Sequence, residues 1–148
     1  MNFSDLNSYF LEPNVDEYYL DKERWEATQI GRNIDTYVNG HFPDNENYEL
    51  AFFNVSEFEG SKNSSCTDFC KIRSYLYSLH FEDLPKIVDL GILKLDSSRK
   101  KSFKLIQDVC EILIQSKIIP IVIGGGHDIN YAIYKSYVSL SRFITLTV

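Results

Sequence analysis

The feature that most constrains the fold is an alternation between short apolar runs and helical patterns from residue 49 onward. Three runs, LAFFNV, KIVDLG and IIPIVI, are each bounded by polar or glycine residues, as buried strands are. A helix is predicted after each run, and RFITLTV predicts a fourth strand. Strands that alternate with helices imply crossover connections. We therefore expect an α/β fold with three layers, α/β/α, in which helices cover both faces of a mainly parallel sheet.

The predicted helices are supported by apolar residues at helical spacing. The first covers residues 67–79, after a loop predicted at SEFEGSKNSS, and the second opens at LDSSRKKSF, where Ser and Asp provide capping groups. Apolar faces of the second and third helices are formed by Phe103, Ile106, Cys110, Leu113 and Ile114, and by Ile129, Ala132, Ile133, Tyr137 and Leu140. Pro120 is tolerable near the start of its strand, where only one ladder hydrogen bond is lost.

Residues 1–48 differ in character from residues 49–148. They form a polar lead rich in Tyr and Asp, with a helix predicted over residues 16–30 and a turn predicted in NGHFPDNEN. No catalytic spacing is found in this lead. The expected organisation is a polar lead, 1–48, followed by an α/β part, 49–148.

Charge and hydropathy exclude several classes of partner. The net charge of −6 argues against a nucleic-acid surface, and the densest basic run, Arg99-Lys100-Lys101, is short enough to be a solvated helix start. The N-terminus has no basic segment followed by an apolar one, and no apolar stretch is long enough to span a bilayer. We expect a cytoplasmic, soluble protein with neither a nucleic-acid nor a membrane partner.

The cysteines are an odd number in a chain without a secretory signal. There are 3 of them, which favours reduced thiols over disulfides. Cys66 and Cys70 lie four residues apart on a predicted helix and could share a metal ion, but no second pair completes such a site. Buried or neutral thiols are the expected role, for Cys110 as well.

The run GGGHD, residues 124–128, ends the third predicted strand. Ligands of open parallel sheets bind beyond the carboxyl ends of the strands, so its position is informative. Three interpretations stay open: a tight turn in which His127 has no special role, a phosphate cradle before a helix, or a metal site that uses the His127 imidazole. The cradle matches neither known glycine-rich phosphate motif. Asp128 is expected to cap the next helix through its carboxylate.

These segments resemble one known family. The stretch IPIVIGGGHDINYAIYKSY resembles the strand, loop and helix of the ureohydrolases, the superfamily of arginase, agmatinase and formimidoylglutamase, and its triple glycine is most similar to the formimidoylglutamase branch. The preceding segments LAFFNVSEFEG, CKIRSYLYSL and IVDLGIL are similar to earlier parts of the same fold, in the same order. The resemblance covers roughly residues 48–148.

The resemblance implies a metallohydrolase. His127 would be a ligand of one ion in a binuclear manganese centre that activates water to attack the carbon of a linear amidine and cleave a C–N bond. Asp128 would be an outer-shell or structural residue, and Arg73 would be structural. His41 and His80 match no family ligand, and no other ligand or catalytic residue is assigned.

The chain also departs from the family pattern. In the family the fourth strand leads into Asp-x-His-x-Asp and a later strand adds two aspartates, but this sequence ends at FITLTV. We expect an N-terminal part of a ureohydrolase, incomplete on its C-terminal side, that binds manganese weakly and has no activity by itself. An unpaired sheet edge would favour a homo-oligomer. The alternatives are a non-catalytic binding or assembly module of the same fold and, with less support, a nucleotide-binding domain.

Overall fold

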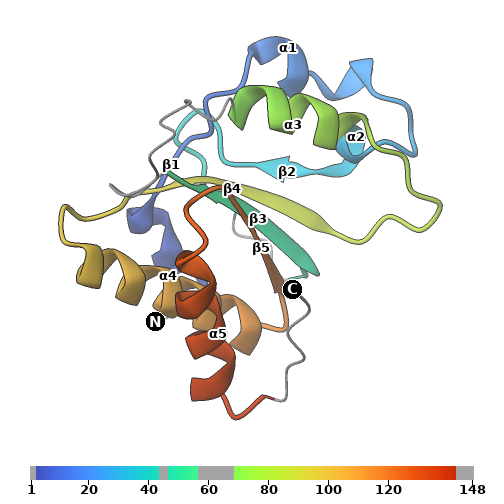
Figure 1. Cartoon of the computed structure of the whole chain (residues 1–148). Helices are drawn as coiled ribbons and strands as arrows, with labels where there is room; N and C mark the ends of the chain where they lie inside the picture. Colours follow the sequence, from blue (N-terminus) through green and yellow to red (C-terminus); the bar gives the residue numbers. More distant parts are fainter. Residues whose placement is uncertain (1–2, 44–46, 57–68, 143–148) are drawn as a thin grey trace.

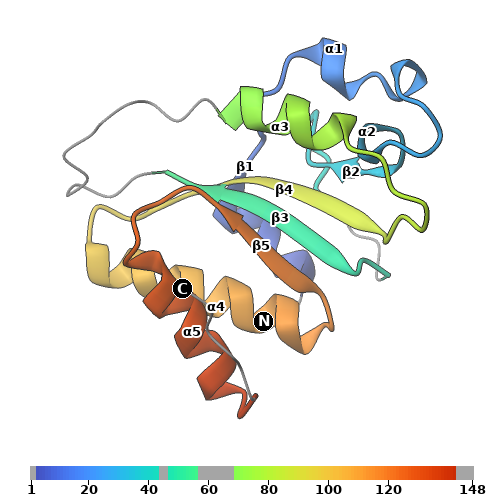
Figure 2. The same cartoon turned by 45° about the vertical axis from the view of Figure 1, so that its right-hand side comes forward.

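The computed structural model describes residues 3–43, 47–56 and 69–142. A central sheet lies between two helical layers, with α1, α2 and α3 on one face and α4 and α5 on the other (Figures 1 and 2). The predicted three-layer α/β/α class is confirmed.

The sheet is mixed but mostly parallel. Its order is β1-β4-β3-β5, with β2 also paired to β4. Strand β1 runs antiparallel to β4, whereas β2, β3 and β5 pair in parallel. The strands are β1 (Phe10–Leu11), β2 (Asp35–Thr36), β3 (Leu50–Val55), β4 (Ile87–Leu93) and β5 (Ile119–Ile123). The three predicted runs are confirmed as β3, β4 and β5, while the fourth predicted strand falls on residues 143–148, outside the described residues.

Helices follow the three core strands as the periodicity predicts. They are η1 (Phe3–Tyr9), α1 (Glu17–Leu20), η2 (Lys22–Arg24), α2 (Ile30–Asn33), α3 (Phe69–Ser78), α4 (Arg99–Gln115) and α5 (Ile129–Ser139), where η denotes a 3₁₀ helix. The predicted loop at SEFEGSKNSS and the first two residues of the helix predicted over 67–79 fall almost entirely on residues 57–68, outside the described residues. Of the described helices, none is long and apolar enough to cross a membrane.

The helix predicted over residues 16–30 is wrong. The segment forms α1, η2 and the first residue of α2 instead of one continuous helix. Asp16 accepts a hydrogen bond from the Tyr18 amide and Asp21 from the Glu23 amide, so each carboxylate starts a new short helix. Aspartate side chains that bond nearby backbone amides compete with helix continuation. The predicted turn near residue 40 is confirmed, because the His41 amide donates to the Val38 carbonyl at 2.9 Å.

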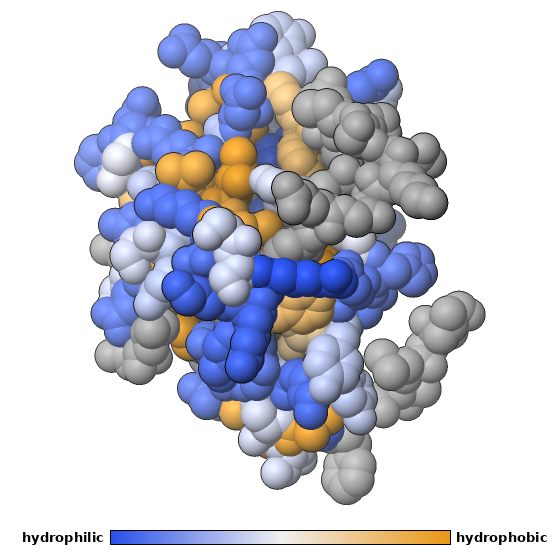
Figure 3. Space-filling view, turned by 60° about the vertical axis from the view of Figure 1, so that its left-hand side comes forward, coloured by the Kyte–Doolittle hydropathy of each residue, from blue (hydrophilic) through white to orange (hydrophobic). Residues whose placement is uncertain are grey.

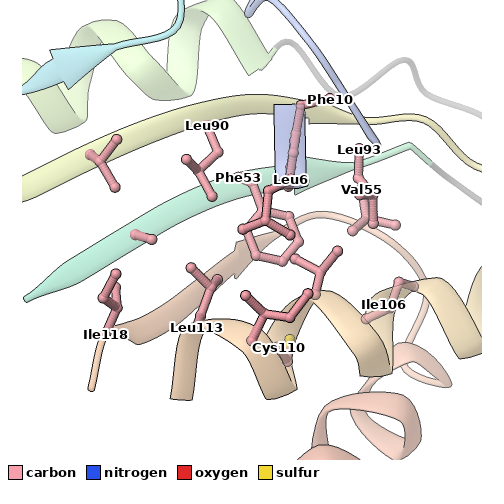
Figure 4. Packing of buried hydrophobic residues seen from close by; sticks show 14 of the residues in the cluster. Leu6, Phe10, Phe53, Val55, Leu90, Leu93, Ile106, Cys110, Leu113 and Ile118 are labelled. Carbon is pink, nitrogen blue, oxygen red and sulfur yellow. The ribbon is translucent and has the colours of Figure 1, made fainter. Parts of the chain in front are cut away.

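The main core lies between the sheet and α4. Side chains of β1, β3 and β4 point toward the α4 face that carries Ile106, Cys110 and Leu113 (Figure 4). Leu6 and Phe10 of the lead join this core, and the Phe10 ring lies 5.5 Å from the Phe53 ring. The lead therefore supplies part of the same apolar layer as the later residues.

The start of α4 is fixed by an aspartate in the preceding loop. The Asp96 carboxylate accepts the Ser98 amide at 2.8 Å. This hydrogen bond, with Lys101 nearby, lowers the pKa of Asp96 below its usual value. Ser98 occupies the cap position without a side-chain cap bond, so Asp96 supplies the predicted capping chemistry.

Candidate functional site

The candidate site begins at the turn between β5 and α5. Gly124 and Gly125 have φ of +87° and +78°, a region that side chains rarely adopt. A Cβ at Gly124 would lie 2.7 Å from the Phe69 ring and 2.9 Å from the Val55 carbonyl oxygen. Gly124 is therefore required for the turn to pack against α3 and the end of β3, whereas a Cβ at Gly125 would meet the Ile129 side chain of α5.

This turn lies where an open sheet binds ligands. Strands β3, β4 and β5 are parallel, and in Figure 1 all three end at the left of the sheet. Figure 3 brings that side forward and shows a largely hydrophilic face with hydrophobic residues between the hydrophilic ones. Parallel strands bind ligands beyond their carboxyl ends, so the turn has the expected position for a site.

His127 is exposed at this end of the sheet, and its backbone carbonyl accepts the Asn130 amide at 3.4 Å. Asp128, its neighbour, occupies the cap position of α5 but has helical backbone angles and makes no side-chain cap bond. The predicted capping role of Asp128 is wrong, because its carboxylate pairs instead with the Arg99 guanidinium at the start of α4. That ion pair joins the starts of two helices.

The described residues do not fit a manganese ion by themselves. In residues 3–43, 47–56 and 69–142, no three His, Cys, Asp or Glu side chains are grouped as a metal site requires. Divalent manganese binds several carboxylate and imidazole ligands. His127 has only Asp128 beside it, and that carboxylate is already paired with Arg99.

A buried ion pair ties α3 to the middle of β4. Arg73 Nε and Nη2 donate to the two Asp89 carboxylate oxygens at 2.7 and 3.0 Å, and both residues are almost fully buried. Arg73 Nη2 also donates to the Gly91 carbonyl, and the Gly91 amide donates to Asp89. Arg73 thus has the structural contacts that the resemblance implies.

Tyr77 completes this network. Its hydroxyl donates to Asp89 at 2.9 Å and lies 3.1 Å from the Thr36 hydroxyl. Burial, with the Asp89 carboxylate nearby, raises the pKa of Tyr77 far above its ordinary value. Sequence reasoning missed the roles of Tyr77 and Asp89, although an Asp in the middle of an apolar strand was a visible signal that a buried partner was needed.

Asn54 is a second polar residue that the sequence reasoning missed. It is fully buried in β3, one residue before the end of the strand, and pairs with Ile92 and Ile123 in the sheet. As far as the described residues show, neither its amide nitrogen nor its amide oxygen has a hydrogen-bond partner. An unpaired buried polar group costs about 1–3 kcal/mol. Asn54 is therefore a candidate polar contact for a ligand at the carboxyl end of the sheet.

The remaining histidines and cysteines have separate environments. Exposed His80 lies with Nδ1 2.9 Å from the Thr28 hydroxyl, and exposed His41 lies with Nδ1 2.9 Å from the Asn39 carbonyl. Cys110 is buried as expected, and burial raises the pKa of its thiol to about 12. Cys70 is half-buried, and Cys66 lies outside the described residues, so a shared metal ion stays untested.

Comparison with known proteins shows which protein family the chain belongs to. A family model described as the arginase family matches residues 62–144, which is more than half of the chain. The match spans α3 through α5 and includes the glycine turn and His127. No curated protein and no solved structure matches the chain. The chain belongs to the arginase family.

Proposed function

We propose that this chain is the N-terminal part of a cytoplasmic, manganese-dependent hydrolase of linear amidines, most similar to formimidoylglutamase. The observation that carries the proposal is an exposed His127 on a glycine turn at the carboxyl end of β5, in a chain of the arginase family. In the complete enzyme, His127 would be one ligand of a binuclear manganese centre, and a small amidine would be the substrate.

The chain by itself is expected to have no hydrolase activity. Its described residues bring no third metal ligand near His127 and Asp128. A hard divalent ion held by one imidazole would exchange freely with solvent. The other ligands are proposed to come from sequence outside this chain.

The first test is a hydrolase assay. If the coding DNA continues in frame into Asp-x-His-x-Asp, the longer product should release ammonia or a substituted amine from formimino or guanidino substrates when manganese is present. Absence of turnover with every such substrate, in a folded and manganese-loaded longer product, would refute the proposal.

The second test concerns His127. We expect His127→Ala in the longer product to lower manganese affinity and turnover by about tenfold or more, because loss of an outer-shell partner of a metal ligand alone costs about 10–100-fold. The matched control is His80→Ala, which removes another exposed histidine just after α3. Equal losses in both variants would show that His127 is not a ligand.

An assembly module of the same fold is the alternative, and one observation favours it. Ile119 and Ile121 of β5 are 57% and 42% exposed, although apolar strand residues are normally covered. β5 also ends the strand order among the described residues. A second copy of the chain would be the partner on this edge. Under this alternative the chain forms a homo-oligomer, and the longer product has no hydrolase activity.

A further inference from the structure

A second site is suggested by a cavity on the α3 side of the sheet. The cavity has a volume of about 570 Å³ and is lined by the lead together with Tyr77 of α3. This volume lies within the range of small-molecule sites, roughly 300–1,000 Å³. None of residues 124–128 lines it, so the cavity is separate from the glycine turn.

Opposite charges stand side by side in the cavity wall. Lys22 Nζ lies 3.3 Å from Asp35 Oδ1, and the two side chains are 50% and 44% exposed. The Tyr48 hydroxyl donates to the other oxygen of Asp35 at 3.0 Å. The backbone of Lys22 is held by Arg32, whose guanidinium donates to the Lys22 carbonyl at 3.0 Å. An ammonium and a carboxylate are thus presented to solvent beside one another in the cavity wall.

The rest of the wall includes several aromatic residues. Tyr19, Phe42, Tyr48 and Tyr77 all line the cavity. The Tyr77 hydroxyl is hydrogen-bonded to Asp89 and Thr36 and the residue is almost fully buried, so the position of its ring in the wall is fixed. Aromatic walls with a few convergent polar groups are typical of small-molecule pockets.

We propose that this cavity binds a free α-amino acid with an apolar or aromatic side chain. The amino group would pair with Asp35, the carboxylate with Lys22, and the side chain would lie against the aromatic rings. A zwitterion can enter the Lys22–Asp35 pair and leave both charges compensated. A ligand with a single charge leaves one partner without a counter-charge. This inference does not depend on the proposed hydrolase function.

The chain carries its own reporter for binding. Its single tryptophan, Trp25, donates from Nε1 to the Tyr19 carbonyl at 3.0 Å. The Trp25 ring centre lies 6.2 Å from that of Tyr19 and 6.3 Å from that of Tyr77, two rings of the cavity wall. A ligand that displaces Tyr19 should therefore change the Trp25 fluorescence.

The experiment is a titration of the whole chain followed by Trp25 fluorescence, excited where phenylalanine does not absorb. Phenylalanine and leucine should give saturable changes, and each should raise the melting temperature. N-acetylphenylalanine and phenylalaninamide should bind about tenfold more weakly, because each loses one charged contact. The absence of a saturable change with any free amino acid, or equal affinity for the blocked forms, would overturn the proposal.

Two variants with a matched control identify the contacts. Lys22→Met and Asp35→Asn should each weaken phenylalanine binding about tenfold. Lys101→Met removes another exposed lysine, paired with Asp96 at 3.7 Å, and should leave binding unchanged. If Asp35→Asn fails to fold, Lys22→Met still decides the question, because a half-exposed lysine can be lost without unfolding. Equal weakening by Lys101→Met would overturn the assignment.

Discussion

Removal of Arg73 is the sharpest test of what holds the α3 layer on the sheet. In Arg73→Met the apolar stem is largely kept while the guanidinium is lost. The variant loses its two bonds to Asp89, at 2.7 and 3.0 Å, and one to the Gly91 carbonyl at 3.2 Å. Asp89 would keep only the Tyr77 hydroxyl and the Gly91 amide as donors.

The expected loss of stability is large because the remaining charge is buried. Asp89 is 0% exposed, so water cannot replace the guanidinium without a local opening. Breaking a buried pair by removing one partner costs about 3–5 kcal/mol. Small domains have a free energy of unfolding of roughly 5–15 kcal/mol, so Arg73→Met should lie near the edge of folding.

The double variant Arg73→Met/Asp89→Asn separates the charge from the packing. The asparagine side chain introduced in place of Asp89 can still accept the Gly91 amide through its oxygen, but it carries no charge. We expect the double variant to recover about 2 kcal/mol or more relative to Arg73→Met, because no buried charge remains.

Urea unfolding followed by circular dichroism measures these differences. The control is Lys104→Met, which breaks the exposed pair of Lys104 with Asp108 at 2.7 Å. That variant should change stability by less than about 0.5 kcal/mol. A loss below about 1 kcal/mol in Arg73→Met, or a double variant no more stable than the single one, would refute the argument that a stranded buried charge dominates.

Three further predictions concern other parts of the molecule. Because burial raises the pKa of Cys110 from 9.0 to about 12, the neutral thiol is favoured in the folded state and stability should fall as pH rises above 9. At pH 10 the contribution of Cys110 to this loss is about 1.4 kcal/mol by urea unfolding; Cys110→Ala should remove that contribution, and Cys70→Ala should not. Asn54→Leu should raise the free energy of unfolding by about 1–3 kcal/mol if the amide has no partner, and a decrease would show that the amide is satisfied. Ile121→Lys should reduce self-association in sedimentation; a wild-type chain that is monomeric at micromolar concentration would contradict the proposed oligomer.

The order of the core elements was determined by the sequence alone. Apolar runs of strand length alternate with residues at helical spacing, and each run became β3, β4 or β5 with a helix after it. The spacing of apolar residues within a strand or a helix is a local pattern, so it can be recognised in the sequence without knowledge of the tertiary contacts. The glycine turn was predictable for the same reason. The positive φ of Gly124 and Gly125 is a property of each residue's own backbone, and glycine adopts it readily.

The polar lead shows where prediction from local sequence patterns fails. Residues 16–30 have enough helical spacing to suggest one helix, but Asp16 and Asp21 each begin a separate short segment. The Trp25 indole then donates to the Tyr19 carbonyl, which holds the chain in a compact loop. Short polar side chains compete with helix continuation, and tertiary contacts decide the outcome.

Only the tertiary structure decided which polar side chains meet. Arg73 and Asp89 lie 16 residues apart and join α3 to β4. Arg99 and Asp128 lie 29 residues apart, and their ion pair removes the carboxylate from the capping role that its position suggests. Such pairings depend on how helices cross the sheet, which no local pattern of residue types specifies. The sequence therefore determined the strands, helices and glycine turn, whereas packing determined the partner of each buried or charged group.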